Sequence, residues 1–277
     1  MLPIALALTS SLGYGVSDFL GGLKSRTLPL LSVLLVSQGS ALAIVAMVVA
    51  VGGEGPPVDH LHYAVLAGLG EALGVSALYR GLAIGTMSVV APLGATAPVV
   101  AVVVGGALGE APSAVQGAGI ALAIAGVVLI STEKDRTSAG PIGPSIIFGL
   151  LTAIGFGTFF VGMDAASEGS VSWALLTARC TIIAIFGIAF LIRRQPLAVD
   201  ARELPILAAI GCLVVSSDTL YAVASTKGLL SVVAVLSSLY PVVTIALARV
   251  YLNERLSGLQ RLGVPAALAG AAVVSVG

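Results

Sequence analysis

Ser88–Gly126 reads SVVAPLGATAPVVAVVVGGALGEAPSAVQGAGIALAIAG, and Ser231–Gly270 repeats much of it as SVVAVLSSLYPVVTIALARVYLNERLSGLQRLGVPAALAG. Both copies begin with Ser-Val-Val-Ala and place Pro-Val-Val ten residues after the first serine. A second set of residues then recurs at identical intervals: Glu110, Ser113, Gln116, Gly119 and Gly126 correspond to Glu254, Ser257, Gln260, Gly263 and Gly270. Matches in order and spacing over this length indicate an internal duplication.

A weaker match extends the duplication toward the N-terminus of the chain. Gly13-Tyr14-Gly15 corresponds to Gly155-Phe156-Gly157, at an offset of 142 residues. The repeated unit therefore spans about half of the chain. We expect a first repeat at residues 1–131 and a second at 144–277, joined by a linker at 132–143.

The composition is that of a protein embedded in lipid. Of the 277 residues, 58% are hydrophobic and only 9% are charged, and the mean hydropathy is +1.10. An average soluble domain carries about 25% charged residues. Thirteen basic residues balance thirteen acidic ones, so no net charge favours nucleic acid as a partner. The expected partner is the lipid bilayer, and Cys180 and Cys212 are expected to be buried thiols within apolar segments.

Ten apolar stretches are long enough to cross the hydrocarbon core, which takes about 20 residues in a helix. Backbone groups in lipid must be paired internally, so each stretch is predicted to be helical. The fold class is all-α and integral to the membrane, with ten transmembrane helices. The predicted spans lie near residues 2–22, 29–51, 61–82, 87–107, 113–131, 144–163, 171–191, 204–222, 231–252 and 260–276.

The number of spans in each repeat predicts how the repeats are related. Half of ten is five, an odd number, so the second repeat enters the membrane in the opposite sense to the first. Inverted repeats allow two related conformations around a site near the middle of the membrane, one open to each side. This symmetry predicts a transporter that works by alternating access.

The repeated motifs resemble the EamA-type members of the drug/metabolite transporter superfamily. The resemblance rests on a proline in the fourth and ninth spans, on Leu-x-Glu at Leu108–Glu110 and Leu252–Glu254, and on Gln-x-x-Gly beginning at Gln116 and Gln260. It implies a ten-helix transporter, often an exporter of metabolites, amino acids or toxic compounds. It also implies a central cavity lined by helices other than the fifth and tenth. One departure is Gly15–Phe19, where many members carry a Trp-Gly pair.

That resemblance leads us to expect a multi-pass protein of a bacterial or archaeal plasma membrane. The positive-inside rule disagrees with it on orientation. Basic residues are concentrated in the connections after the first, fifth, seventh and ninth spans, which puts both termini outside. The resembled family usually has both termini in the cytoplasm, so both orientations stay open.

Glu71 and Arg179 are predicted to lie deepest in the membrane among the charged residues. A charged side chain at this depth costs about 2.5–3.5 kcal/mol on insertion scales, so it needs a partner or a function. One interpretation is that the two face the interior and interact directly or through substrate. The other is a fixed ion pair that only positions helices.

Asp18 is the next candidate, with Tyr14 one helical turn before it. The functional interpretation is a carboxylate that exchanges a proton during transport, which makes protons the candidate coupling ion. The alternative is an interfacial residue paired with Lys24 or Arg26. Asp164 and Asp218 lie closer to span ends, where solvation at the interface is the simpler interpretation.

Pro92, Pro98 and Pro241 stand inside apolar spans and are expected to kink or break the helices. Broken helices in transporters expose backbone groups to substrate, although a simple kink is an equally good interpretation. Polar residues near these prolines are candidates for lining the cavity, with core packing as the alternative. They are Thr96, Ser237, Ser238 and Tyr240.

Glu110 and Glu254 recur at equivalent helix junctions. The first turn of a helix offers free N–H groups, and Pro112 suits an early position in that turn. We therefore interpret the two glutamates as caps of the following helices rather than as substrate ligands.

The sequence carries no pattern typical of catalysis. His60 and His62 lie in a polar connection, and no metalloprotease, nucleophile-elbow or Walker motif is present. We expect no enzymatic activity, cofactor or metal site, and a small-molecule substrate. Two alternatives to a carrier stay open: a facilitative pore, and a non-transporting intramembrane enzyme or partner subunit.

Overall fold

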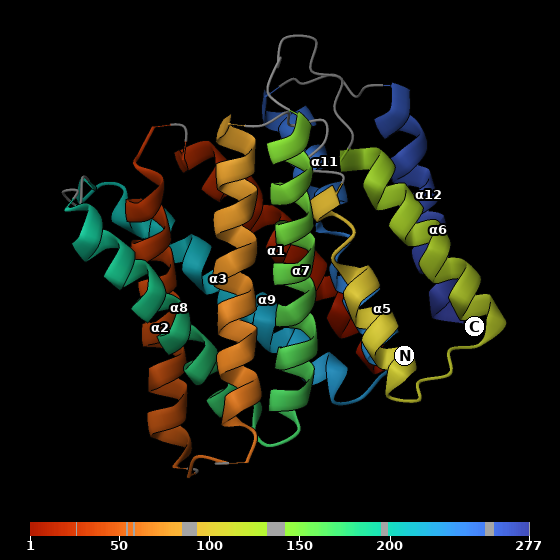
Figure 1. The fold of residues 1–277 in the computed structure, drawn as a ribbon, viewed down its shortest axis with the longest axis horizontal. Helices are drawn as coiled ribbons and strands as arrows, with labels where there is room; N and C mark the ends of the chain where they lie inside the picture. The colour runs from red at the N-terminus through yellow and green to blue at the C-terminus, as the bar shows by residue number, and fades with distance from the viewer. Residues whose placement is uncertain are drawn as a thin grey trace.

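The computed structural model describes residues 1–25, 27–53, 55–57, 59–84, 93–131, 142–194, 199–252 and 258–276. Over these residues the chain is helical and contains no strand (Figure 1). The helices are α1 (Leu2–Ser25), α2 (Leu30–Gly52), α3 (Leu61–Ile84), α5 (Pro98–Ala107), α6 (Ala114–Ser131), α7 (Ile142–Ser167), α8 (Val171–Arg193), α9 (Leu204–Ser225), α10 (Leu230–Ser237), α11 (Tyr240–Leu252) and α12 (Gly258–Val276).

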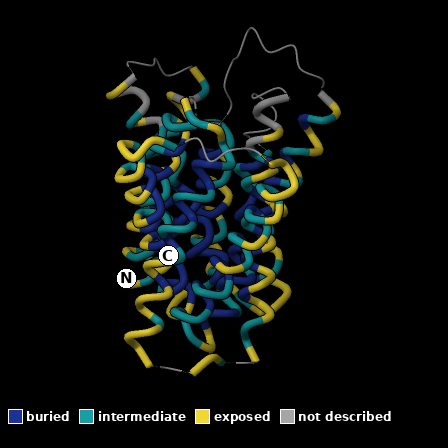
Figure 2. The backbone as a smooth tube through the Cα atoms, turned by 90° about the vertical axis from the view of Figure 1, so that its left-hand side faces the viewer, coloured by how far each residue is buried: buried dark blue, intermediate teal, exposed yellow. Residues whose placement is uncertain are grey.

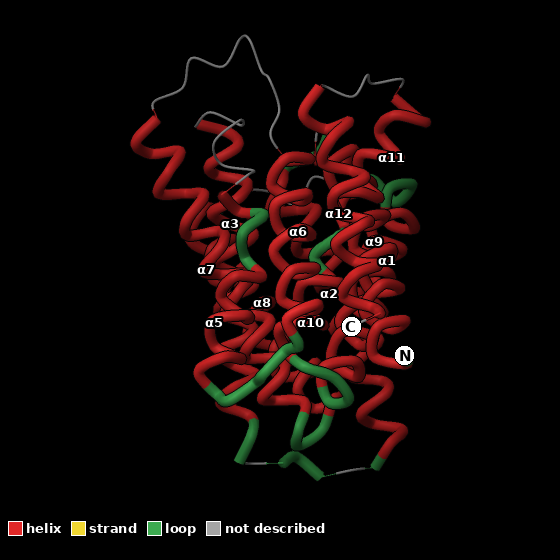
Figure 3. The backbone as a smooth tube through the Cα atoms, turned by 90° about the vertical axis from the view of Figure 1, so that its right-hand side faces the viewer, coloured by secondary structure: helices red, strands yellow, loops and turns green. Residues whose placement is uncertain are grey.

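All ten predicted spans contain helix in their described parts. The ninth span is divided into α10 and α11, and the fourth contains α5. Figure 3 shows that the helices run mostly along one direction, with most loops at the two ends. In the described part of the chain, the helices long and apolar enough to cross a membrane are Leu30–Gly52, Leu61–Leu78, Gly143–Ser167, Val171–Arg193 and Leu204–Ser225. Shorter apolar helical segments are Pro98–Ala107, Ala114–Leu129, Arg261–Val276 and Leu230–Thr244, the last of which includes the break between α10 and α11.

The packing of α6 on α12 shows that the repeats are inverted. Gly126 of α6 lies against Ala267 of α12, and Gly270 of α12 lies against Ala123 of α6. Adding the repeat offset of 144 residues to Ala123 and Gly126 gives Ala267 and Gly270, so each contact is the counterpart of the other. The residue number falls along α6 as it rises along α12, so these equivalent helices are antiparallel.

The first helix of each repeat packs into the other repeat in the same way. Helix α1 packs on α9, and its counterpart α7 packs on α3. Figure 1 shows α3 and α7 side by side at the centre of the molecule. Gly15 of α1 lies against Val243 of α11, and Gly157 of α7 lies against Val100 of α5. A side chain at either glycine would collide with its neighbour, so the small residues allow the close approach.

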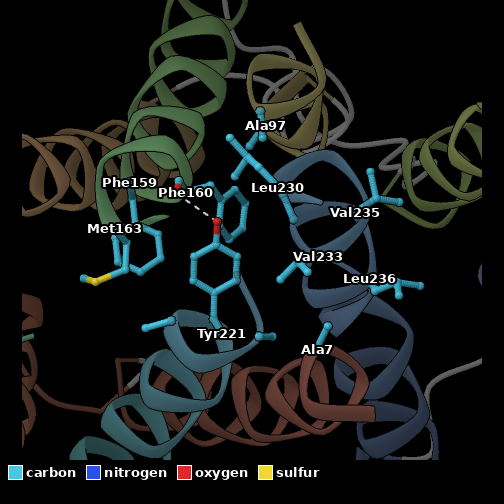
Figure 4. Packing of buried hydrophobic residues seen from close by; sticks show 14 of the residues in the cluster. Ala7, Ala97, Phe159, Phe160, Met163, Tyr221, Leu230, Val233, Val235 and Leu236 are labelled. Carbon is cyan, nitrogen blue, oxygen red and sulfur yellow. Dashed lines mark hydrogen bonds between the residues drawn. The ribbon is translucent and has the colours of Figure 1, made fainter. Parts of the chain in front are cut away.

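A solid core fills the end of the molecule nearer the N-terminus of α1. Ala7, Tyr221, Val233 and Leu236 are completely buried there (Figure 4). The hydroxyl of Tyr221 donates a hydrogen bond of 2.8 Å to the carbonyl oxygen of Phe160. This bond joins α9 to α7 across the core.

The outer face is apolar, as expected for contact with lipid. Figure 2 shows exposed residues along the outside of the helices and buried residues within. Cys180 and Cys212 are exposed, so the prediction that both are buried is wrong. Apolar residues on a lipid-facing surface need no protein partner, and hydropathy therefore cannot distinguish that surface from the core. Large exposed hydrophobic residues include Met47, Val48, Ile147, Ile188 and Leu191.

Candidate functional site

A cavity of about 330 Å³ lies between the two repeats. Its volume is at the lower end of the range for small-molecule sites, about 300–1,000 Å³. Helices of both repeats contribute to its wall, and among the described residues none of the lining comes from α6 or α12. Its polar and charged lining residues are Tyr14, Ser17, Asp18, Ser37, Gln38, Glu71, Asp218, Ser238 and Tyr240.

The cavity extends toward the C-terminal end of α1 and not toward its N-terminal end. Helix α1 lines it from Tyr14 to Gly22, whereas Ala7 of the same helix belongs to the solid core. Phe159 and Phe160 of α7 belong both to the cavity wall and to that core. The core therefore closes one end of the cavity.

Arg179 is the centre of a buried polar network beside the cavity. Its guanidinium donates through Nη1 to Glu71 Oε1 at 3.0 Å and through Nη2 to Asp218 Oδ2. Nη1 also donates to Gln38 Oε1. The Arg179 side chain is 0% exposed, so these acceptors replace the water that it would otherwise bind.

Tyr14 extends this network into the first helix. Its hydroxyl donates to Asp218 Oδ1 at 2.5 Å, while the other oxygen of Asp218 accepts from Arg179. The Tyr14 ring also lies edge-on to Tyr240, with ring centroids 6.4 Å apart. The network thus joins α1, α2, α3, α8 and α9 around one side of the cavity.

The network holds more negative charge than positive charge. Arg179 contributes +1 and the two carboxylates of Glu71 and Asp218 contribute −2, which leaves −1 when all three are ionised. Glu71 lines the cavity, and its Oε2 atom has no hydrogen-bond partner among the described residues. This oxygen is itself buried, so it lies in the wall without a partner and is not presented to the cavity.

Asp18 lines the cavity and makes no ion pair with Lys24. The ammonium of Lys24 instead lies 2.5 Å from Glu203 Oε2, and Arg26 is outside the described residues. Asp18 is exposed to the cavity on the face of α1 that also carries Tyr14. The predicted pairing of Asp18 with Lys24 is therefore not observed. The alternative pairing with Arg26 falls on a residue outside the described ones.

The structure divides the predicted polar residues near the prolines into two groups. Ser238 and Tyr240 line the cavity. Ser237 and Thr96 are outside the described lining, and their hydroxyls bond to the backbone. The Ser237 hydroxyl donates to Ala7 O at 3.4 Å, and the Thr96 hydroxyl donates to Leu93 O at 2.6 Å.

Of the three prolines predicted to kink or break helices, the two that are described lie at helix starts. Pro98 is the first residue of α5 and lines the cavity, and Pro241 is the second residue of α11. The interruption before Pro241 is the break between α10 and α11, where Ser238 enters the cavity wall. Pro92 lies outside the described residues.

Asp218 is the principal residue that sequence reasoning misjudged. Its predicted position near a span end favoured an interfacial role, but only 1% of its side chain is exposed. Helix α9 continues to Ser225, three residues beyond the predicted span, which moves Asp218 inward. Gln38 was also missed, although it lies 141 residues from Arg179 and so occupies nearly the same position in the other repeat.

Glu110 is a cap, but of a different helix from the one predicted. Its Oε1 and Oε2 atoms accept the backbone N–H groups of Leu230 and Ser231, the second at 3.0 Å. These residues begin α10 in the other repeat, so the prediction that Glu110 caps the helix after it is wrong. The first turn of that following helix is instead held by Ser113 and Gln116, which exchange hydrogen bonds with each other. Glu254 lies outside the described residues.

Comparisons with known proteins agree with this architecture. One similar solved structure is described only as the crystal structure of a protein. It aligns with a TM-score of 0.80 at 17% sequence identity, and the alignment covers 99% of this chain and 96% of that chain. The two proteins therefore share a fold. An uncharacterized protein of Methanocaldococcus jannaschii is 30% identical over 134 residues, 48% of this chain and 96% of that protein. A profile of the EamA-like transporter family matches residues 1–132 and again residues 143–276. The chain is therefore a multi-pass integral membrane protein that belongs to the EamA-like transporter family.

Proposed function

We propose that this transporter carries small metabolites, amino acids or drug-like compounds by alternating access, and that it exports them. The observation that supports this most strongly is a one-sided cavity between two inverted repeats. The cavity runs from Tyr14 toward Gly22, while the opposite end is filled around Ala7 and Tyr221. If the repeats exchanged their local conformations, the cavity would face the other side.

A facilitative pore is a weaker candidate because of the solid core. A pore needs a continuous path, whereas Ala7, Tyr221 and Val233 are completely buried at the closed end. Transport through such a structure requires the packed end to open. This is the step that alternating access supplies.

The test is counterflow in proteoliposomes that contain the full chain. A comparison of metabolites in cells with and without the protein would first identify compounds that change. Preloading vesicles with such a compound should then accelerate uptake of the labelled compound, and the rate should saturate. A flux that rises linearly with concentration and shows no counterflow would favour the pore. Loss of a cellular activity without any flux would favour an intramembrane enzyme or a partner subunit.

Export is the direction that the resemblance to exporters favours. It predicts a higher intracellular concentration of the substrate in cells that lack the protein. A lower concentration in those cells would instead identify an importer.

A further inference from the structure

The described cavity lining has charged groups of one sign only. Asp18, Glu71 and Asp218 line the cavity, and no lysine or arginine does so in the described part of the chain. A cavity whose wall carries acidic groups attracts cations and repels anions. The sign of the wall is thus the first indication of the substrate's charge.

Arg179 does not present a compensating positive charge to a molecule bound in the cavity. Its side chain is completely buried behind the wall, and both terminal nitrogens donate to Glu71, Asp218 or Gln38. Nε has no hydrogen-bond partner among the described residues, but it is buried with the rest of the side chain, so an anionic substrate would have to open the wall to reach the guanidinium. Such a substrate would also lie against the carboxylates, which is unfavourable in a site of low dielectric constant.

Asp18 supplies a carboxylate whose counter-ion is absent among the described residues. Lys24, the nearest cation along the chain, is paired with Glu203. A neutral substrate that fills the cavity would displace water from Asp18 without replacing its interactions, which is costly for an ionised group. A cation would replace that water with an ion pair.

Aromatic side chains complete the wall around these acidic groups. Tyr14, Tyr240, Phe156, Phe159 and Phe160 all line the cavity. Aromatic faces attract organic cations and also bury the apolar body of a ligand. A small inorganic cation would leave most of the apolar wall uncovered.

We infer that the substrate is a small organic monocation, an ammonium group on an apolar or aromatic body. Asp18 is its counter-ion, and the buried carboxylates of Glu71 and Asp218 add to the negative potential of the wall. This inference rests on the proposed transport function and adds the substrate's chemical class. The acidic wall, the enclosed arginine and the aromatic lining each support the same class.

The experiment measures binding of three probes of similar shape to the purified full chain by calorimetry. The probes are 2-phenylethylammonium, which is cationic, 2-phenylethanol, which is neutral, and phenylacetate, which is anionic. The expected result is that the cation binds at least about tenfold more tightly than either other probe. Equal or tighter binding of the neutral or anionic probe would overturn the inference.

Variants at Asp18 test its assigned role. Asp18→Asn should weaken binding of 2-phenylethylammonium at least about tenfold and change binding of 2-phenylethanol less than about twofold. Asp18→Glu, which keeps the charge, should retain most of the affinity and shows that the site still folds. Asp200→Asn removes one exposed acidic charge outside the described lining and is the matched control, expected to have no effect. Unchanged cation binding in Asp18→Asn would refute the counter-ion role.

Counterflow with a whole-cell metabolite extract separates this inference from the proposed function. Saturable counterflow together with no preference for the cationic probe would reject the organic cation and leave the carrier intact. Absence of any counterflow would reject the carrier itself. Transport of a neutral compound driven by a pH gradient and abolished by Asp18→Asn would assign Asp18 to proton coupling and overturn the inference.

Discussion

Tyr14 and Asp218 form a hydrogen bond of 2.5 Å between the first and second repeats. The bond has no counterpart under the repeat symmetry. The residue equivalent to Tyr14 at an offset of 142 is Phe156, which has no hydroxyl, and the residue equivalent to Asp218 is Ser76. The two repeats therefore share a backbone arrangement but not a polar network.

Tyr14→Phe tests what this bond contributes to stability. Hydrogen bonds to charged groups contribute about 1.5–3 kcal/mol, and the change also leaves one oxygen of Asp218 without its donor. We expect a loss of that size in the free energy of unfolding, measured by denaturant titration in detergent. Tyr251→Phe is the control because Tyr251 is 70% exposed. Equal losses in both variants would contradict a specific role for the bond.

Arg179→Met is expected to destabilise the protein more than any surface substitution. Removing one partner of a buried ion pair costs about 3–5 kcal/mol because the other charge is left uncompensated. Here two carboxylates, Glu71 and Asp218, would lose their cation. Unfolding measurements should show the loss for Arg179→Met and little change for Arg193→Met, which removes an exposed charge at the end of α8.

Replacing all three charges distinguishes a structural network from a functional one. The triple variant Arg179→Met, Glu71→Gln and Asp218→Asn should recover much of the lost stability, because no buried charge is left unpaired. If transport is also recovered, the network only positions helices. Exchanging the charges of Glu71 and Arg179 alone should restore neither stability nor transport, since the new carboxylate at position 179 would face the carboxylate of Asp218.

The duplicated motifs and the odd number of spans per repeat were sufficient to predict the inverted ten-helix fold. Repeats constrain topology because each span must cross the bilayer and each repeat must bury the same faces. The polar network could be predicted only in part. Glu71 and Arg179 were identified because burying a charge is costly. The burial of Asp218 could not be predicted in this way, because it depends on where α9 ends. The helix that Glu110 caps is determined by a contact between the repeats, and the spacing of residues along one helix junction does not reveal such a contact.

Gly126→Ala should weaken the contact between α6 and α12. A Cβ at Gly126 would overlap the backbone of Ala267, whereas a Cβ at Gly117 of the same helix would meet nothing within 4 Å. Overpacking a close contact typically costs about 1–3 kcal/mol, while alanine is favoured over glycine within a helix by about 0.5–1 kcal/mol. Thermal unfolding in detergent should therefore show a lower midpoint for Gly126→Ala and an equal or higher one for Gly117→Ala. The opposite order would contradict the packing argument.

A disulfide across the closed end should stop transport. The Ser237 hydroxyl lies 3.4 Å from the backbone oxygen of Ala7, so Ala7→Cys and Ser237→Cys lie on the two sides of the contact of α1 with α10, and loss of free thiols would show that oxidation joins them. Cys180 and Cys212 would first be replaced by serine. We expect oxidation to abolish counterflow and reduction to restore it, with each single cysteine variant unaffected by oxidation. Undiminished counterflow in the oxidised double variant would show that this end does not need to open.

Glu110→Gln is expected to ease opening of the same closed end. The carboxylate of Glu110 accepts the N–H groups of Leu230 and Ser231, and an anion at a helix N-terminus contributes about 0.3–1 kcal/mol, or up to about 2 kcal/mol when partly buried. Glutamine keeps the size of the side chain but removes its charge and one acceptor, so α10 should separate more readily from the end of the first repeat. The measurement is the rate at which Val233→Cys, completely buried in the closed structure, reacts with a membrane-impermeant maleimide in a chain without Cys180 and Cys212. A loss of about 1 kcal/mol should accelerate labelling about fivefold. Glu168→Gln, at an exposed acid beyond the end of α7, should leave the rate unchanged, and an unchanged rate in Glu110→Gln as well would show that this cap does not hold the end closed.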